Sequence, residues 1–325
     1  MRSSSAVITA AILIGTVIAP LSALANPGRV PGPATVAEVS AANFLEAPSI
    51  LAPASVYPLG KQSYRVVAQM LDRAVMDATG TRKFQEAWGS LSGQGERVGI
   101  LLDAQYPPAS LALLDALIDR LVRAGVRPAS ITVWADSETS LFSAGLLVRK
   151  DPDGVRTMGA ESEGFRGGIS RIVLEECDLL ISLARLRADR QLGMWGATST
   201  QLACVPRADR LQMMSAPEQL ALAASRPSVR LKFRLHILDA LQPNVEPGPA
   251  RIPPYWNCGK VLASTDCVAL DMAGLNILTG KMIEEQRETS SLETARQYLQ
   301  AACAVHRLGQ ADPAQITVQS HALGE

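Results

Sequence analysis

The sequence lacks the composition of a nucleic-acid-binding protein. Aromatic residues make up only 4% of its 325 residues, and 31 Lys and Arg residues balance 31 Asp and Glu residues. Domains that bind nucleic acid usually carry a basic excess, and single-strand binders stack bases on aromatic side chains. We therefore expect no nucleic-acid partner.

Residues that bind metals and clusters are also scarce. The chain has five cysteines and three histidines, with no C-x-x-C pair and no H-x-x-x-H pair. It therefore carries no iron–sulfur or zinc motif, and any cofactor stays unknown. The G-x-S-x-G serine elbow and the G-x-G-x-x-G phosphate loop are missing as well.

The one sustained apolar run lies at the N-terminus. Arg2 is the only charge before residue 26, residues 6–19 are mainly apolar, and Ala23-Leu24-Ala25 follows. This pattern predicts a signal peptide over residues 1–25, with an uncleaved anchor as the alternative. We expect a periplasmic or secreted protein that begins near Asn26. No later run predicts a stable membrane span.

Export raises the question of disulfides, which oxidising compartments favour. Cys258 and Cys267 flank a short predicted strand over residues 260–263. A strand rises ~3.3 Å per residue, which separates the two thiols too far for a bond unless the chain folds back. We predict that both are unpaired.

Strand-length apolar runs alternate with helical patterns along most of the chain. Residues 98–102 and 131–135 read as buried strands, with a helix over about 110–124 between them. This unit and its repetition predict an α/β fold: a mostly parallel sheet with helices on both faces. We assign it to a single domain over residues 61–325. The Pro- and Ala-rich residues 26–60 read as an arm or linker. Further strands are predicted at 178–182, 235–239, 260–263 and 315–318.

The sharpest local motif spans Leu262 to Asp271, where a strand runs directly into a helix. Ser264 or Thr265 can cap that helix, and Asp266 suits the positive end of its dipole. Asp271 lies five residues further, about 140° around the helix, so the two carboxylates do not share a face. The motif is explained either as a well-capped helix or as the rim of a ligand crevice.

This motif resembles the signature of the domain of unknown function 362 family, found in bacteria and archaea. Leu262-Ala263-Ser264, Asp266 and Val268-Ala269-Leu270-Asp271 match it, and Cys267 replaces the usual proline. Residues 235–241, with Asp239, and residues 308–316 are similar to two further segments of the family. The resemblance covers about residues 64–318 and implies no single reaction.

Three places depart from that family's pattern. Leu101-Leu102-Asp103 stands where family members have lysine-proline-asparagine, and Arg187-Ala188-Asp189 where they have lysine-x-histidine. Ser199-Thr200 replaces a lysine-asparagine pair. Arg187 keeps a positive charge but cannot act as a base. Any chemistry of the family has therefore diverged in this chain or been lost.

Polar side chains follow several predicted strands, where open parallel sheets bind their ligands. If the whole sheet is parallel, these groups converge at one edge and bind a small polar or anionic ligand, with Arg187 as the main positive contact. The chain is then a diverged enzyme or a non-catalytic binding or accessory protein. The alternatives are a solvated loop for the arginines and a core position for His236. The candidate residues are Arg185, Arg187, Asp239, Ser264, Thr265, Asp266 and Asp271.

Overall fold

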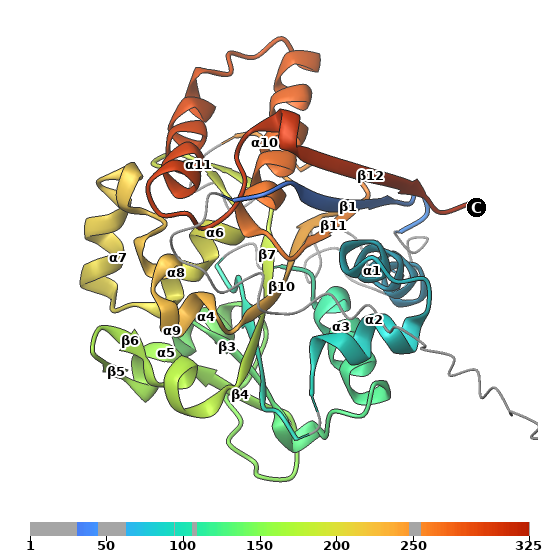
Figure 1. The fold of residues 1–325 in the computed structure, drawn as a ribbon, viewed down its shortest axis with the longest axis vertical. Coiled ribbons are helices and arrows are strands. Elements are labelled where there is room, and N and C mark those ends of the chain that lie inside the picture. The colour runs from blue at the N-terminus through green and yellow to red at the C-terminus, as the bar shows by residue number, and fades with distance from the viewer. Residues whose placement is uncertain (1–30, 45–62, 94, 106–108, 247–254, 325) are drawn as a thin grey trace, which may run out of the picture.

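The computed structural model describes residues 31–44, 63–93, 95–105, 109–246 and 255–324. They form an eight-stranded sheet in the order β12-β1-β11-β10-β7-β2-β3-β4, with helices packed around it (Figure 1). The predicted α/β class is confirmed. The strands are β1 (Ala34–Ser40), β2 (Val98–Leu102), β3 (Ile131–Ala135), β4 (Arg156–Gly159), β7 (Leu179–Arg185), β10 (Phe233–Ala240), β11 (Lys260–Ser264) and β12 (Ile316–Ala322).

Strand β11 runs against the rest of this sheet. It pairs antiparallel with both β1 and β10, whereas the other neighbouring pairs are parallel. The sheet is therefore mostly parallel, as predicted. However, the carboxyl end of β11 lies at the opposite edge from the carboxyl ends of the other strands.

The order of the strands reverses at β2. From β2 the chain proceeds to β3 and β4 on one side, and then returns to form β7 and β10 on the other side. The gap between the carboxyl ends of β2 and β7 is thus a topological switch point, where open α/β sheets form their ligand crevice.

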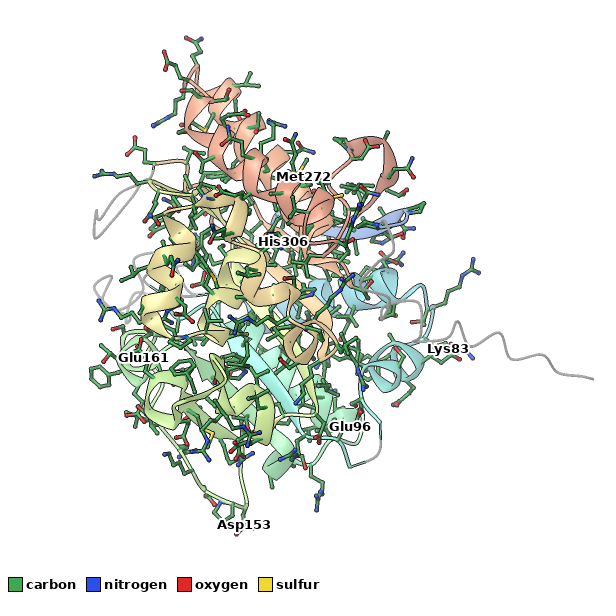
Figure 2. All side chains as sticks on the ribbon, turned by 60° about the vertical axis from the view of Figure 1, so that its left-hand side comes forward. Lys83, Glu96, Asp153, Glu161, Met272 and His306 are labelled. Atoms are coloured by element: carbon green, nitrogen blue, oxygen red, sulfur yellow. The ribbon has the colours of Figure 1, made fainter. Side chains whose placement is uncertain are left out.

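Helices cover both faces of the sheet, as predicted. The alternation of side chains along a strand sends Ile100 to one core and Leu101 to the other. The first core packs under α1 (Tyr64–Thr79), α2 (Phe84–Leu91) and α3 (Leu111–Arg123). The second packs under α6 (Ala197–Thr200), α10 (Cys267–Glu284) and α11 (Glu293–Ala304). Charged side chains such as Lys83 and Asp153 lie on the outside (Figure 2).

The predicted arm contains a strand of this sheet. Strand β1, within residues 26–60, pairs with β11 and β12, and Val36 and Val39 are fully buried on opposite faces. The prediction of a linker there was wrong for residues 34–40. Small residues such as Ala34 and Ala37 fill the remaining buried positions, and their weak hydrophobicity hid the strand pattern.

Three further predictions concern the cysteines, a membrane span and the signal peptide. All five cysteines are free thiols, which confirms the prediction for Cys258 and Cys267. Within the described ranges, no helix is long and apolar enough to cross a membrane. The predicted signal peptide over residues 1–25 lies outside the described residues.

Candidate functional site

Four charged side chains gather at the carboxyl edge, beside the switch point. Asp103 directly follows β2, Arg185 ends β7, Arg187 begins the short strand β8 (Arg187–Asp189), and Asp239 lies near the end of β10. Each residue is at most 7% exposed. Two of the four carry positive charge and two are carboxyl groups, so the cluster combines opposite charges in a dry environment.

Arg187 is held by three neighbours. Its Nη1 donates a hydrogen bond to Oδ2 of Asp103 at 2.5 Å, and its Nη2 donates to Oε1 of Gln105 at 3.2 Å. The guanidinium carbon lies 4.9 Å from the ring centroid of Trp195, in cation–π contact. The predicted ligand contact is therefore also a structural ion-pair partner. Asp103 was missed as a site residue, although it is the first polar residue after a buried strand.

Arg185 and Asp239 form the second half of the cluster. Arg185 donates to the carbonyl oxygen of Gln242 at 2.5 Å, and its guanidinium carbon lies 5.2 Å from the ring centroid of Tyr255. The carboxylate of Asp239 accepts hydrogen bonds from the backbone amides of Ser110 at 2.8 Å and Leu241 at 3.0 Å. Burial raises the pKa of Asp239, and the nearby charge of Arg185 opposes this rise.

Ser264, Thr265 and Asp266 do not join this cluster. The expected convergence is wrong because β11 is antiparallel: Ser264 lies opposite His236, whereas Asp239 lies opposite Val261. Three residues of strand separate the two places by about 10 Å. The hydroxyl of Ser264 instead donates to the carbonyl oxygen of Thr35 at 2.7 Å, which ties β11 to β1.

Asp266 caps helix α10. Its Oδ1 accepts hydrogen bonds from the backbone amides of Val268 and Ala269, both at 2.9 Å, and its Oδ2 accepts from that of Gln310 at 2.9 Å. A Cβ atom on Gly309 would overlap this carboxylate, so the contact requires glycine there. Burial outweighs these hydrogen bonds and raises the pKa of Asp266 to about 6.

Asp271 caps a second helix. Its two carboxylate oxygens accept hydrogen bonds from the backbone amides of Ala197 at 2.6 Å and Thr198 at 2.7 Å, at the start of α6. A Cβ atom on Gly196 would overlap it. Burial raises the pKa of Asp271 to about 6. Both signature aspartates thus anchor helix ends. The predicted capped helix is present, but its N-cap is Asp266 and not Ser264 or Thr265.

A buried pair of side chains lies at the middle of β7 and β10. Ser182 Oγ lies 2.8 Å from Nδ1 of His236, and the two residues are neighbours on β7 and β10. The imidazole stacks on the ring of Phe233 at 5.2 Å between centroids. Burial lowers the pKa of His236 to about 3, so the ring is neutral at physiological pH. The core position expected for His236 is confirmed.

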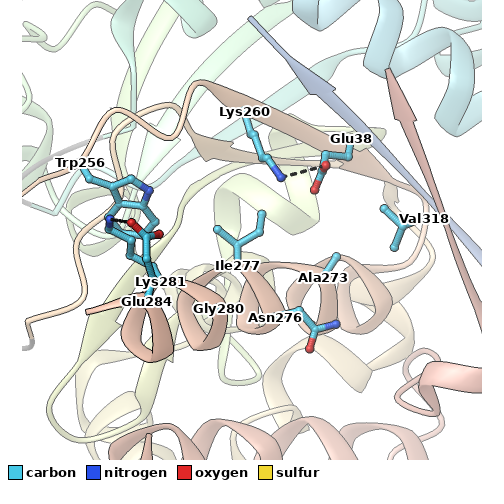
Figure 3. A pocket seen from close by; sticks show the side chains of 10 residues that line it. All are labelled: Glu38, Trp256, Lys260, Ala273, Asn276, Ile277, Gly280, Lys281, Glu284 and Val318. Carbon is cyan, nitrogen blue, oxygen red and sulfur yellow. Dashed lines mark hydrogen bonds and ion pairs between the residues drawn. The ribbon is translucent and has the colours of Figure 1, made fainter. Parts of the chain in front are cut away.

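A separate groove of about 400 Å³ lies between α10 and the strands β1, β11 and β12 (Figure 3). Its charges are already paired, Lys260 with Glu38 at 3.0 Å and Lys281 with Glu284 at 2.9 Å. It contains none of the predicted site residues. Over the part of the chain that the structure describes, no three His, Cys, Asp or Glu side chains cluster in a way that could hold a metal ion.

The cap formed by Asp271 leads to a prediction. In the Asp271→Asn variant, an amide group replaces one acceptor oxygen and faces a backbone N–H. We expect the free energy of unfolding to fall by about 1–3 kcal/mol, the usual cost of an unsatisfied buried polar group. Urea denaturation measures it, with the exposed Asp115→Asn on α3 as a control that should stay unchanged. Equal stability of Asp271→Asn and the wild type would show that the cap is dispensable.

The neutral His236 leads to a pH prediction. An unfolded histidine has a pKa of about 6.5, so below that pH the unfolded chain binds a proton that the folded protein does not. The unfolding free energy therefore decreases as the pH falls, by about 2 kcal/mol from this group between pH 7 and pH 5. The His236→Gln variant should lack this contribution. Equal pH slopes in urea denaturation of the two proteins would contradict the prediction.

Comparison with known proteins agrees with the signature. Residues 162–276, which include β7, β10, β11 and the first half of α10, match the family model described as "Domain of unknown function (DUF362)". No curated protein matches the chain. A crystal structure of a Thermotoga maritima protein is similar with a TM-score of 0.31 and 11% identity, over 54% of this chain and 53% of that protein. The chain thus spans about half the length of that protein. The similarity to the domain of unknown function 362 family is thus found over residues 162–276.

Proposed function

We propose that the chain binds a small polar ligand with an anionic group at the carboxyl edge, between β2 and β7. One observation carries the proposal: Asp103, Arg185, Arg187 and Asp239 are buried together at the topological switch point of the sheet. Open α/β sheets bind ligands at that place. The sequence-based prediction selected three of these four residues.

Stability alone is a poor reason for such a cluster. Removing two guanidinium groups and two carboxyl groups from water costs several kcal/mol per ion, and well-packed apolar residues often serve the fold as well or better. Charged groups that persist in a buried cleft are therefore candidates for function.

Arg187 is the member of this cluster that has an unused hydrogen-bond donor. Its Nε–H makes no hydrogen bond with any residue in the described ranges, and its side chain is 9% exposed, compared with 1% for Asp103. Trp195 fixes the plane of the guanidinium from one face. A fixed, planar guanidinium with a free N–H matches a carboxylate or phosphate group.

Binding, rather than catalysis, is the function that these residues favour. Asp266 and Asp271, the two carboxylates of the family signature, accept hydrogen bonds from helix-end amides and act as caps. His236, a potential base, lies in the middle of β10, three residues before Asp239 and opposite Ser264. This favours the alternative of a non-catalytic binding or accessory protein over that of a diverged enzyme.

The test needs a variant that folds. Arg187→Ala leaves Asp103 buried without its partner and should lose about 3–5 kcal/mol of stability. The double variant Asp103→Asn, Arg187→Gln removes both charges and keeps an amide pair. We expect it to fold and to bind 10- to 100-fold more weakly, because a charge-assisted hydrogen bond contributes about 1.5–3 kcal/mol.

Native mass spectrometry of the purified protein identifies a bound ligand, and calorimetry measures its affinity, with phosphate and citrate as probes if none co-purifies. The matched control is Asp72→Asn, Arg120→Gln, an ion pair at 2.8 Å between α1 and α3. Unchanged affinity in the Asp103 and Arg187 double variant, or the same loss in the control, would contradict the proposed site.

Export belongs to the same proposal, and the N-terminal sequence supports it through the apolar run and Ala23-Leu24-Ala25. The ligand is then met in the periplasm or outside the cell. N-terminal sequencing of the protein from its native host should find Asn26, or a residue close to it, first. An intact Met1 on exported protein would argue for an uncleaved anchor.

A further inference from the structure

A small cavity lies at the edge opposite the proposed ligand site. It has a volume of about 40 Å³ and is bounded by the first half of β10, the start of α10 and the end of α9 (Pro227–Arg230). Phe233, Cys267 and Leu308 form the less polar walls, and the polar groups come from Gln201, Arg230, His236 and Thr265. Thr265 is thus at a cavity, but not at the one where it was predicted.

The hydrogen bonds of Ser182 fix the tautomer of His236. The Ser182 hydroxyl is fully buried, and Nδ1 of His236 is its one acceptor among the described residues. Most buried hydroxyls donate their hydrogen, so we assign Oγ–H as the donor to Nδ1 and place the ring proton on Nε2. Nε2–H has no acceptor among the same residues, and His236, only 4% exposed, lines the cavity. The imidazole therefore offers a buried, unused donor.

Arg230 supplies a positive charge to the same cavity. It is half-buried and forms no ion pair with any residue for which the structure gives a position. The charge of Arg230 acts on the carboxylate of Asp266, but Asp266 accepts three backbone hydrogen bonds and forms no ion pair with Arg230 among the described residues. The guanidinium donors are therefore available to a molecule inside the cavity.

We infer that this cavity is a binding site for a small anion, such as a carboxylate group, held by Arg230, Nε2–H of His236 and the hydroxyl of Thr265. Each of these groups can donate a hydrogen bond, and two of them offer only donors. A cavity of this size accommodates a few atoms, which suits a formate-sized anion. The site is independent of the ligand site at the carboxyl edge.

Histidine side-chain NMR provides a direct test, because the chain has only three histidines. Formate is the probe, and formamide is a neutral molecule of nearly the same shape. Formate should shift the ¹⁵N resonances of His236 in a saturable way, and formamide should not. Equal shifts with both molecules would show that the cavity accepts any small polar molecule and would overturn the inference.

Three variants locate the effect. Arg230→Gln should weaken formate binding at least tenfold, whereas Arg207→Gln, at an exposed arginine on α7 (Arg207–Met214), should leave it unchanged. The Asp103→Asn, Arg187→Gln variant should also respond to formate as the wild type does, which separates this site from the carboxyl edge. Unchanged formate affinity in Arg230→Gln would refute the assignment.

Discussion

The reversed direction of β11 determines where the buried polar groups of this protein lie. Because β11 enters the sheet antiparallel to β10, the family signature that follows it emerges at the edge opposite the switch point. Asp266 then caps α10 and binds the backbone of Gln310, and Asp271 caps α6. The sheet consequently holds two sets of buried polar groups, one around Arg187 and the other around His236.

Much of the fold follows from local patterns. The runs at residues 98–102 and 131–135 are buried on both faces, and the helix between them covers one side, so the parallel unit was predictable. The placement of Arg185, Arg187 and Asp239 at the carboxyl edge followed from the further parallel strands predicted at 178–182 and 235–239. The hydrophobic pattern was weak at β1, because alanines occupy buried positions there.

The direction of β11 is not encoded in its own residues, because a short apolar strand reads the same in either orientation. The segment that precedes β11 does indicate its direction. Parallel neighbours need a crossover, usually a helix, whereas residues 241–259 are rich in proline and show no helical pattern. The pairing of Arg187 with Asp103 was likewise invisible, since it joins residues from strands far apart in the sequence.

The pairing of β1 has a consequence for how the chain is made. This early strand completes its hydrogen bonds only with β11 and β12, which come from the last quarter of the sequence. Contacts of such long sequence separation form slowly, and a chain emerging from the ribosome cannot make them until synthesis is nearly complete. Three neighbouring strands at one side of the sheet therefore assemble last. Until then their unpaired edges offer binding places to chaperones and to one another.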